Sequence, residues 1–159
     1  MLHDVPRLRA VTPPLADAIL VVDDDADSRQ MLAEYLAFAG FTVHSAANGA
    51  TAVEAADALR PHVILMDLAM AELDDLETTC RLRAHASTKD ATIVAVAARA
   101  DEAYREAASR AGCNFFVPKP LDLAVFAQFV ADLMSAGPQT AGRRPLNFAP
   151  QSLELHHRD

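Results

Sequence analysis

The chain has 159 residues, of which 52% are hydrophobic, and it carries a formal net charge of -8 with a pI near 5.1. This acidity argues against a nucleic-acid surface, which needs a basic patch, and no apolar stretch reaches the roughly 20 residues of a membrane span. Cys80 and Cys113 lie far apart and form no CxxC motif, so we expect free thiols and a reducing cytoplasm.

Residues 1–17 contain three prolines and show no apolar periodicity, which predicts a flexible leader. The apolar run 18–22 predicts the first strand. Asp25 or Asp27 can then cap a helix over about 28–39 by accepting from free N–H groups of its first turn. Apolar residues at spacings of three and four predict the buried stripe of this helix, namely Met31, Leu32, Tyr35, Leu36 and Ala39.

The segment 41–45 alternates apolar and polar residues, as a short strand near an edge of the sheet would. Asn48 is expected to cap a helix over about 49–59, which Pro61 would end. Four of the five residues at 62–66 are apolar, which predicts a central strand there that is buried on both faces.

A loop is expected over 68–75, followed by a helix over about 76–85. The run 91–96 predicts the fourth strand. Asp101 suits the start of a helix that ends before Gly112, because acidic residues are favoured in a first helical turn.

The fifth strand is predicted at 114–117, and Asp122 is expected to cap a last helix over 123–134. Residues 137–159 predict a flexible tail. Five strand–helix units thus alternate without a break, which predicts one α/β domain over 18–136 with a parallel sheet covered by helices on both faces.

Acidic residues end the first and third predicted strands. If these strands are neighbours, Asp23, Asp24 and Asp67 lie within a few ångströms, where three carboxylates stay ionised only if a cation binds. An all-oxygen site with room for water suits Mg²⁺. Lys119 follows the fifth strand at the same edge, and a carboxylate beside both cations can attack a phosphoryl group. The alternative is that residues 23–25 form only a helix cap and a solvated turn.

Three segments, ILVVDDD at 19–25, VILMDLAM at 63–70 and FVPKP at 116–120, together resemble the receiver domain of two-component response regulators. The resemblance covers about residues 18–134. It implies a flavodoxin-like doubly wound fold with a five-stranded parallel sheet in the order 2-1-3-4-5.

The resemblance also implies that Asp67 accepts a phosphoryl group from a phosphohistidine of a sensor histidine kinase or phosphotransfer protein. Mg²⁺ would be bound directly by Asp24, Asp67 and the backbone carbonyl of Ala69. Asp23 would act on the metal mainly through water.

Lys119 would contact the acyl phosphate, and Pro120 would follow a cis peptide bond. Receivers usually carry Thr or Ser at the end of the fourth strand, where this chain has Ala97, and the aromatic switch position is Phe116, which has no hydroxyl. The loop 70–75 also lacks the usual proline and glycine. We therefore expect phosphorylation to be read out weakly or by another route.

The leading hypothesis is a stand-alone cytoplasmic receiver, not an enzyme beyond slow autodephosphorylation, that signals to a downstream protein as a monomer or weak homodimer. It would bind neither nucleic acid nor membrane. A second hypothesis is a degenerate receiver that acts as a phosphorylation-independent adaptor. A third is a Mg²⁺-dependent phosphohydrolase with Asp67 as nucleophile, but such enzymes place a second acid two residues further on, where this chain has Ala69.

Overall fold

The computed structural model describes residues 18–68 and 72–136, so the predicted leader and tail lie outside the described residues. The strands are β1 (Ala18–Val22), β2 (Thr42–Ala46), β3 (Val63–Asp67), β4 (Thr92–Ala97) and β5 (Phe115–Pro118). The helices are α2 (Ala26–Phe38), α3 (Gly49–Leu59), α4 (Glu72–Ala84), α5 (Glu102–Ala111) and α6 (Leu123–Ala136).

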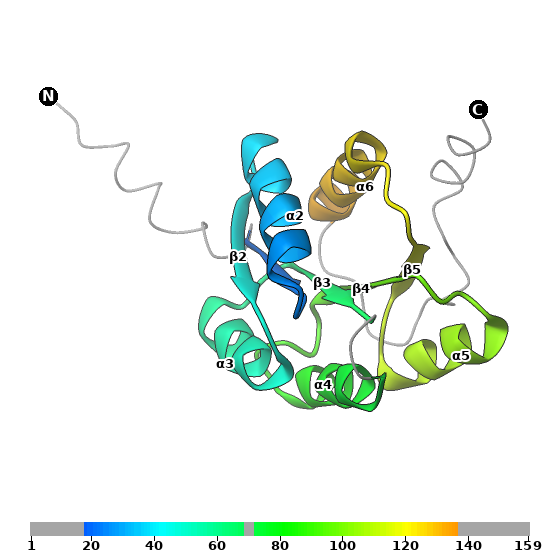
Figure 1. Ribbon diagram of the computed structural model, residues 1–159. Helices are drawn as coiled ribbons and strands as arrows, with labels where there is room; N and C mark the ends of the chain where they lie inside the picture. Colours follow the sequence, from blue (N-terminus) through cyan, green and yellow to red (C-terminus); the bar gives the residue numbers. More distant parts are fainter. Residues whose placement is uncertain (1–17, 69–71, 137–159) are drawn as a thin grey trace, which may run out of the picture.

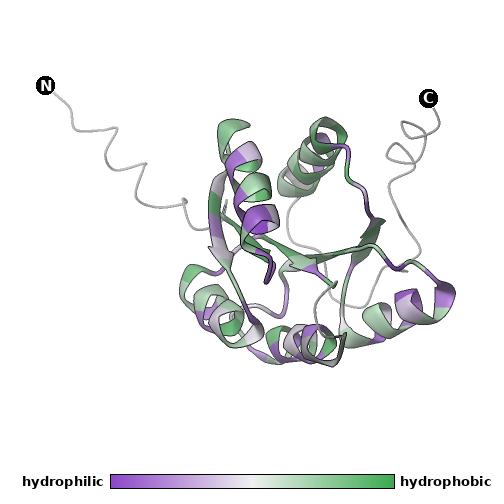
Figure 2. Cartoon of the chain, in the orientation of Figure 1, coloured by the Kyte–Doolittle hydropathy of each residue, from purple (hydrophilic) through white to green (hydrophobic). Residues whose placement is uncertain are grey.

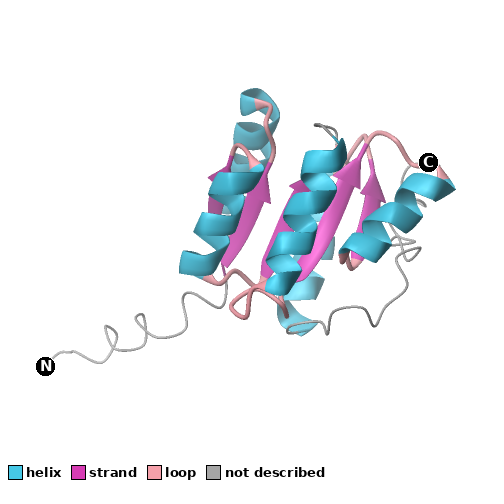
Figure 3. Cartoon of the chain, turned by 90° about the horizontal axis from the view of Figure 1, so that it is seen from below, coloured by secondary structure: helices cyan, strands magenta, loops and turns pink. Residues whose placement is uncertain are grey.

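The strands form one parallel sheet in the order β2-β1-β3-β4-β5, which confirms the predicted fold class and strand order. Figure 3 shows the strands running in the same direction. The alternating strand seen at 41–45 in the sequence is β2, and its place at one edge of the sheet confirms that expectation.

Two helical layers enclose the sheet, with α2 and α6 on one face and α3, α4 and α5 on the other (Figure 1). Successive residues of β1 enter the two cores in turn: Ile19 and Val21 pack with α2 and α6, while Leu20 and Val22 pack on the other face. Because both faces are covered, the inner strands β1, β3 and β4 are apolar except at Thr92, which begins β4, and Asp67, which ends β3, and Figure 2 shows their mainly hydrophobic colouring.

The helix caps agree with the predictions. Each cap carboxylate or amide oxygen accepts a backbone N–H three residues further on, at 2.9 to 3.3 Å: Asp25 from Ser28, Asn48 from Thr51, Asp101 from Tyr104 and Asp122 from Val125. These bonds satisfy donors that an α-helix leaves free in its first turn.

Two helix predictions need correction. α4 begins at Glu72 rather than at about 76, so the expected loop over 68–75 was too long. The sequence from 72 to 75 contains three acidic residues, which favour a first helical turn through the helix dipole. α2 likewise begins at Ala26, directly after its cap, rather than at 28.

The predicted buried stripe of α2 is only partly correct. Leu36 is fully buried and Leu32 is half-buried, but Ala39 is exposed and Met31 is 55% exposed. Phe38, which was not part of the stripe, is 91% exposed. The stripe differs because α2 packs on the sheet mainly through the face that carries Leu36. Met31 instead borders a cavity between α2 and α6.

Cys80 and Cys113 are both free thiols, as expected, and Cys113 is buried, but Cys80 is exposed rather than buried as a small hydrophobic residue would be. Within 18–68 and 72–136, no helix combines the length and apolar character that a membrane crossing needs.

Candidate functional site

Four chain segments meet at the carboxyl edge of the sheet. Asp67 is the last residue of β3 and Ala97 the last of β4, while Asp23 directly follows β1 and Lys119 directly follows β5. Because β1, β3, β4 and β5 are consecutive in the sheet, these four residues gather in one place. This edge is where open parallel sheets bind their ligands.

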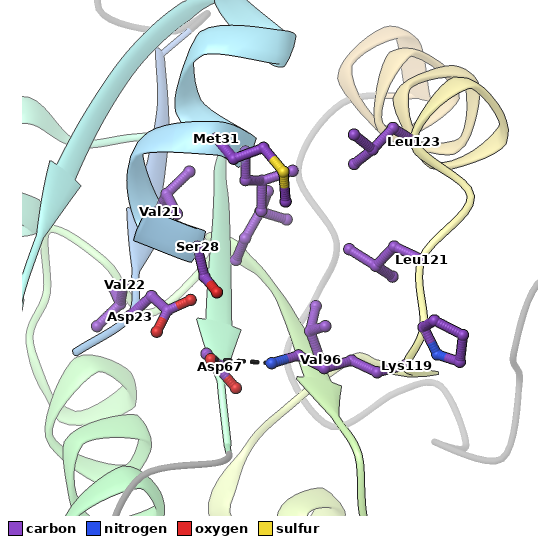
Figure 4. Close-up of a pocket in the computed structure, with 13 residues that line it drawn as sticks. Val21, Val22, Asp23, Ser28, Met31, Asp67, Val96, Lys119, Leu121 and Leu123 are labelled. Atoms are coloured by element: carbon purple, nitrogen blue, oxygen red, sulfur yellow. Dashed lines mark hydrogen bonds and ion pairs between the residues drawn. The ribbon is translucent and has the colours of Figure 1, made fainter. Parts of the chain in front are cut away.

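Asp67 and Lys119 form the central contact of the site. The Lys119 Nζ donates to Asp67 Oδ2 across 3.2 Å, which is the dashed line in Figure 4. The Asp67 side chain is 8% exposed and that of Lys119 31%. The Lys119 backbone N–H also donates to the Ala97 carbonyl, and the peptide bond between Lys119 and Pro120 is cis, as predicted.

Asp23 is the second acidic residue of the site and is only 6% exposed. Burial raises the pKa of Asp23 to about 6. The Asp25 N–H, which donates to Asp23 Oδ1 across 2.9 Å, opposes that rise, whereas the neighbouring Asp67 carboxylate adds to it; the Lys119 ammonium lowers the pKa. One ammonium thus faces two carboxyl groups, so a further cation would be favoured at this position.

The predicted gathering of three carboxylates is formed only in part, because Asp24 is exposed and does not line the cavity beside Asp67. Among the residues that the structure describes, no three His, Cys, Asp or Glu side chains lie close enough to hold a metal ion. The Asp23 and Asp67 oxygens still fit Mg²⁺, which commonly uses one or two carboxylates and keeps several waters. The predicted ligand Ala69 lies outside the described residues.

A cavity of about 290 Å³ extends from these acids between α2 and α6 (Figure 4). Asp23, Asp67 and Lys119 lie at one end, and its walls include Met31 and Leu123. The site is therefore open on the side of α2 and apolar beyond its charged end.

The two switch positions that the receiver resemblance implies, Ala97 and Phe116, carry no hydroxyl group. Ala97 and Phe116 are both fully buried. Neither side chain can donate a hydrogen bond, so the expectation of a weak or different readout stays a prediction.

Sequence reasoning missed one polar contact of the residue that follows β3. The Tyr104 hydroxyl, from α5, donates to the carbonyl of Leu68 across 2.5 Å, directly after Asp67 in the chain. An aromatic residue in a helix rich in charge and alanine is a signal of burial, and Tyr104 is 3% exposed. The sequence held no signal for the partner of its hydroxyl.

A family model described as the response regulator receiver domain matches residues 19–131, most of the chain. The chain therefore belongs to the response regulator receiver domain family of two-component signal transduction, which confirms the resemblance.

Several proteins are similar to this chain. The response regulator MprA of Mycobacterium ulcerans is 38% identical over 105 residues, which cover 66% of this chain and 44% of MprA. An uncharacterised 14.6 kDa protein of Leptolyngbya boryana is 34% identical over 123 residues, 77% of this chain and 94% of that protein. The chain spans less than half the length of several curated relatives that it matches.

Among solved structures, the receiver domain of the sensor histidine kinase PA1611 from Pseudomonas aeruginosa is similar, with a TM-score of 0.68 and 28% sequence identity. The match covers 76% of this chain and 98% of that one. That structure has a magnesium ion coordinated in its active-site cleft.

Without a divalent cation, the protein is expected to lose stability as the pH rises from about 4 to about 6. The pKa of Asp23 is about 6 in the folded chain, against 3.8 for an ordinary aspartate. Folding thus favours the protonated Asp23 carboxyl. Its contribution to the free energy of unfolding is therefore complete below about pH 4 and lost above about pH 6. The shift corresponds to at most about 3 kcal/mol.

Urea unfolding in a chelating buffer, at about pH 4.5 and about pH 7.5, compares wild type with Asp23→Asn. The variant should become the more stable protein at the higher pH, because it has no carboxylate to desolvate. Adding Mg²⁺ at neutral pH should reduce the difference in unfolding free energy between the two proteins. If the free energies of unfolding of the two proteins changed with pH in parallel, the role given to Asp23 would be contradicted.

Proposed function

We propose that the chain is a response-regulator receiver in which the Asp67 carboxylate accepts a phosphoryl group from a phosphohistidine on a sensor histidine kinase or phosphotransfer protein. The observation that carries this proposal is the Lys119 ammonium, 3.2 Å from Asp67 at the end of an otherwise apolar strand. A carboxylate is held there, nearly buried, beside one fixed positive charge and open to a cavity.

In the proposed reaction an Asp67 oxygen attacks phosphorus, the phosphorus–nitrogen bond of the donor breaks, and its electron pair returns to the imidazole. The product is an acyl phosphate on Asp67. Lys119 offsets the charge on the transferred oxygens, and the preformed position of its ammonium reduces the reorganisation required during transfer.

Asp23, Asp24, Asp67 and the Ala69 carbonyl would hold Mg²⁺, which when bound neutralises charge on the phosphoryl oxygens. The support from the structure is the pair formed by Asp23 and Asp67, whose mutual repulsion a cation offsets. The similar receiver of PA1611 with its bound magnesium supports the choice of metal.

The proposed output is binding to a downstream protein, by a receiver that acts in the cytoplasm as a monomer or weak homodimer. Support for a receiver that works without an attached output domain comes from the Leptolyngbya boryana protein, which the match covers over 94% of its length. Catalysis beyond slow loss of the phosphoryl group is not expected, because the proposed site serves as an acceptor.

Incubation with a small phosphodonor and Mg²⁺ tests the proposal. The protein should gain one phosphoryl group that hydroxylamine removes, as expected for an acyl phosphate. A mass that stays unchanged at every donor concentration would count against it.

A second candidate function is a phosphorylation-independent adaptor, which the fully buried Ala97 and Phe116 favour because neither can contact a phosphoryl group through a hydroxyl. Phosphotransfer from a sensor kinase, with wild type compared against Asp67→Ala, separates the two. A downstream partner that binds both proteins equally would support the adaptor.

Lys119→Met is expected to slow phosphoryl labelling by about 100-fold, because it removes the fixed charge that faces the transferred oxygens. Lys89→Met is the matched control: Lys89 is the chain's other lysine and is exposed, with Asp90 as its ion-pair partner. Labelling rates from time-resolved intact mass measure the effect. Equal rates for the two variants would show that Lys119 has no part in transfer.

A further inference from the structure

Leu68, the residue after Asp67, is held from two sides. Its N–H donates to the Val96 carbonyl across 2.8 Å, which continues the pairing of β3 with β4. Its carbonyl accepts the Tyr104 hydroxyl across 2.5 Å. The peptide groups next to the acceptor carboxylate are therefore fixed both to the sheet and to a side chain of α5.

Tyr104 is itself firmly placed. Its ring meets the Phe116 ring edge to face, with centroids 6.3 Å apart, and the Arg99 guanidinium lies 4.7 Å above the ring. Its backbone N–H donates to the Asp101 cap. With the ring held by these neighbours, the hydroxyl is directed at the Leu68 carbonyl rather than free to rotate to another acceptor.

We propose that Tyr104 is a positioning residue for Asp67, whose hydroxyl fixes the chain after the acceptor carboxylate and transmits changes at Asp67 to α5. The inference rests on the proposed function, since it gives the same site its readout. Tyr104, on α5, supplies a hydroxyl that is hydrogen-bonded to the residue after Asp67. The two usual switch positions, Ala97 and Phe116, carry no hydroxyl.

The Leu68 peptide and the Tyr104 hydroxyl restrain each other through their hydrogen bond. A phosphoryl group on Asp67 adds charge and volume beside the Leu68 peptide. If that peptide shifts, its carbonyl must either carry Tyr104 along or lose a buried hydrogen bond, and both outcomes alter α5. Because the Tyr104 ring packs on Phe116, the same shift also reaches β5. A tyrosine that only filled the core would show no such dependence on Asp67.

The chain has only two tyrosines, which provides a matched pair of variants. Tyr104→Phe removes the hydroxyl and keeps the ring, while Tyr35→Phe removes the hydroxyl from a half-buried tyrosine on α2. In each background Asp67→Asn supplies a change at the acceptor without any ligand. Amide NMR then records how far the change travels into α5.

In wild type and in Tyr35→Phe, Asp67→Asn should shift the amide resonances of α5 and the carbonyl ¹³C resonance of Leu68. In Tyr104→Phe the α5 shifts should be lost, and unfolding curves check that the variant is folded. A purely structural role for Tyr104 would lower stability and leave the α5 shifts in place. Unchanged α5 shifts in the Tyr104→Phe background would overturn the inference.

Labelling by a small phosphodonor gives the second readout. Tyr104→Phe should be labelled about three- to tenfold more slowly, as expected when one hydrogen bond that positions the nucleophile is lost, and Tyr35→Phe should match wild type. Labelling of Tyr104→Phe at the wild-type rate would also overturn the inference. If wild type is not labelled at all, the proposed function fails, and the ligand-free α5 shifts still decide the role of Tyr104.

Discussion

Asp67→Asn is expected to reduce phosphoryl labelling to background. The amide is nearly the same size as the carboxylate, so the site keeps its shape, but a neutral amide is a far weaker nucleophile toward phosphorus. It also removes one of the three carboxyl groups that are proposed to hold Mg²⁺, those of Asp23, Asp24 and Asp67. Intact mass after incubation with a phosphodonor and Mg²⁺ measures the loss.

Asp132→Asn is the control for this experiment, because Asp132 is an exposed acid on α6, away from the carboxyl-edge site. It should be labelled like wild type. A labile adduct that persists in Asp67→Asn would place the acceptor elsewhere and contradict the proposed function.

Arg83→Met is expected to destabilise the fold by about 2–4 kcal/mol, because several acceptors lose a charged donor together. From the last turn of α4, the half-buried guanidinium donates to the carbonyls of Gly112, Lys89 and Ala91 and to Asn114 Oδ1, at 2.5 to 2.9 Å. It thereby ties the connection into β4 to the connection into β5. Urea unfolding at neutral pH measures the loss.

Arg81→Met provides the comparison from the same helix. Arg81 is 58% exposed and pairs with the exposed Glu77 across 3.3 Å, so its replacement should cost less than about 1 kcal/mol. Similar losses for the two variants would contradict the assigned role of Arg83. Arg83 also packs closely against Gly112. A Cβ added at Gly112 would lie 2.5 Å from Arg83 Cγ, so this contact requires glycine there.

The main parts of the site could be predicted from the sequence because they end apolar strands. Asp67 and Lys119 follow short apolar runs of the kind that a buried parallel strand has, and the carboxyl ends of such strands share one edge. Their contact at 3.2 Å also depends on the strand order, which the family resemblance implied. The cis bond before Pro120 came from the family resemblance rather than from physical reasoning.

Other features depend on three-dimensional neighbours that the pattern does not contain. Neighbouring acids 23 and 24 look alike in sequence, yet Asp23 is buried toward Asp67 and Asp24 is exposed. Arg83 reads as an ordinary basic residue of a helix end, and Tyr104 as a core aromatic. The bonds from Arg83 to Gly112 and Asn114 and from Tyr104 to Leu68 join residues 29 to 36 positions apart, which local periodicity cannot identify.

The most direct measurement is tandem mass spectrometry of wild-type protein that has been treated with a phosphodonor and Mg²⁺ and trapped chemically before digestion. The site described above predicts a single phosphoryl group per chain, carried by the peptide with residue 67 and absent when Mg²⁺ is chelated. A modification mapped to any other residue, or sustained hydrolysis of the donor with no adduct on Asp67, would contradict it.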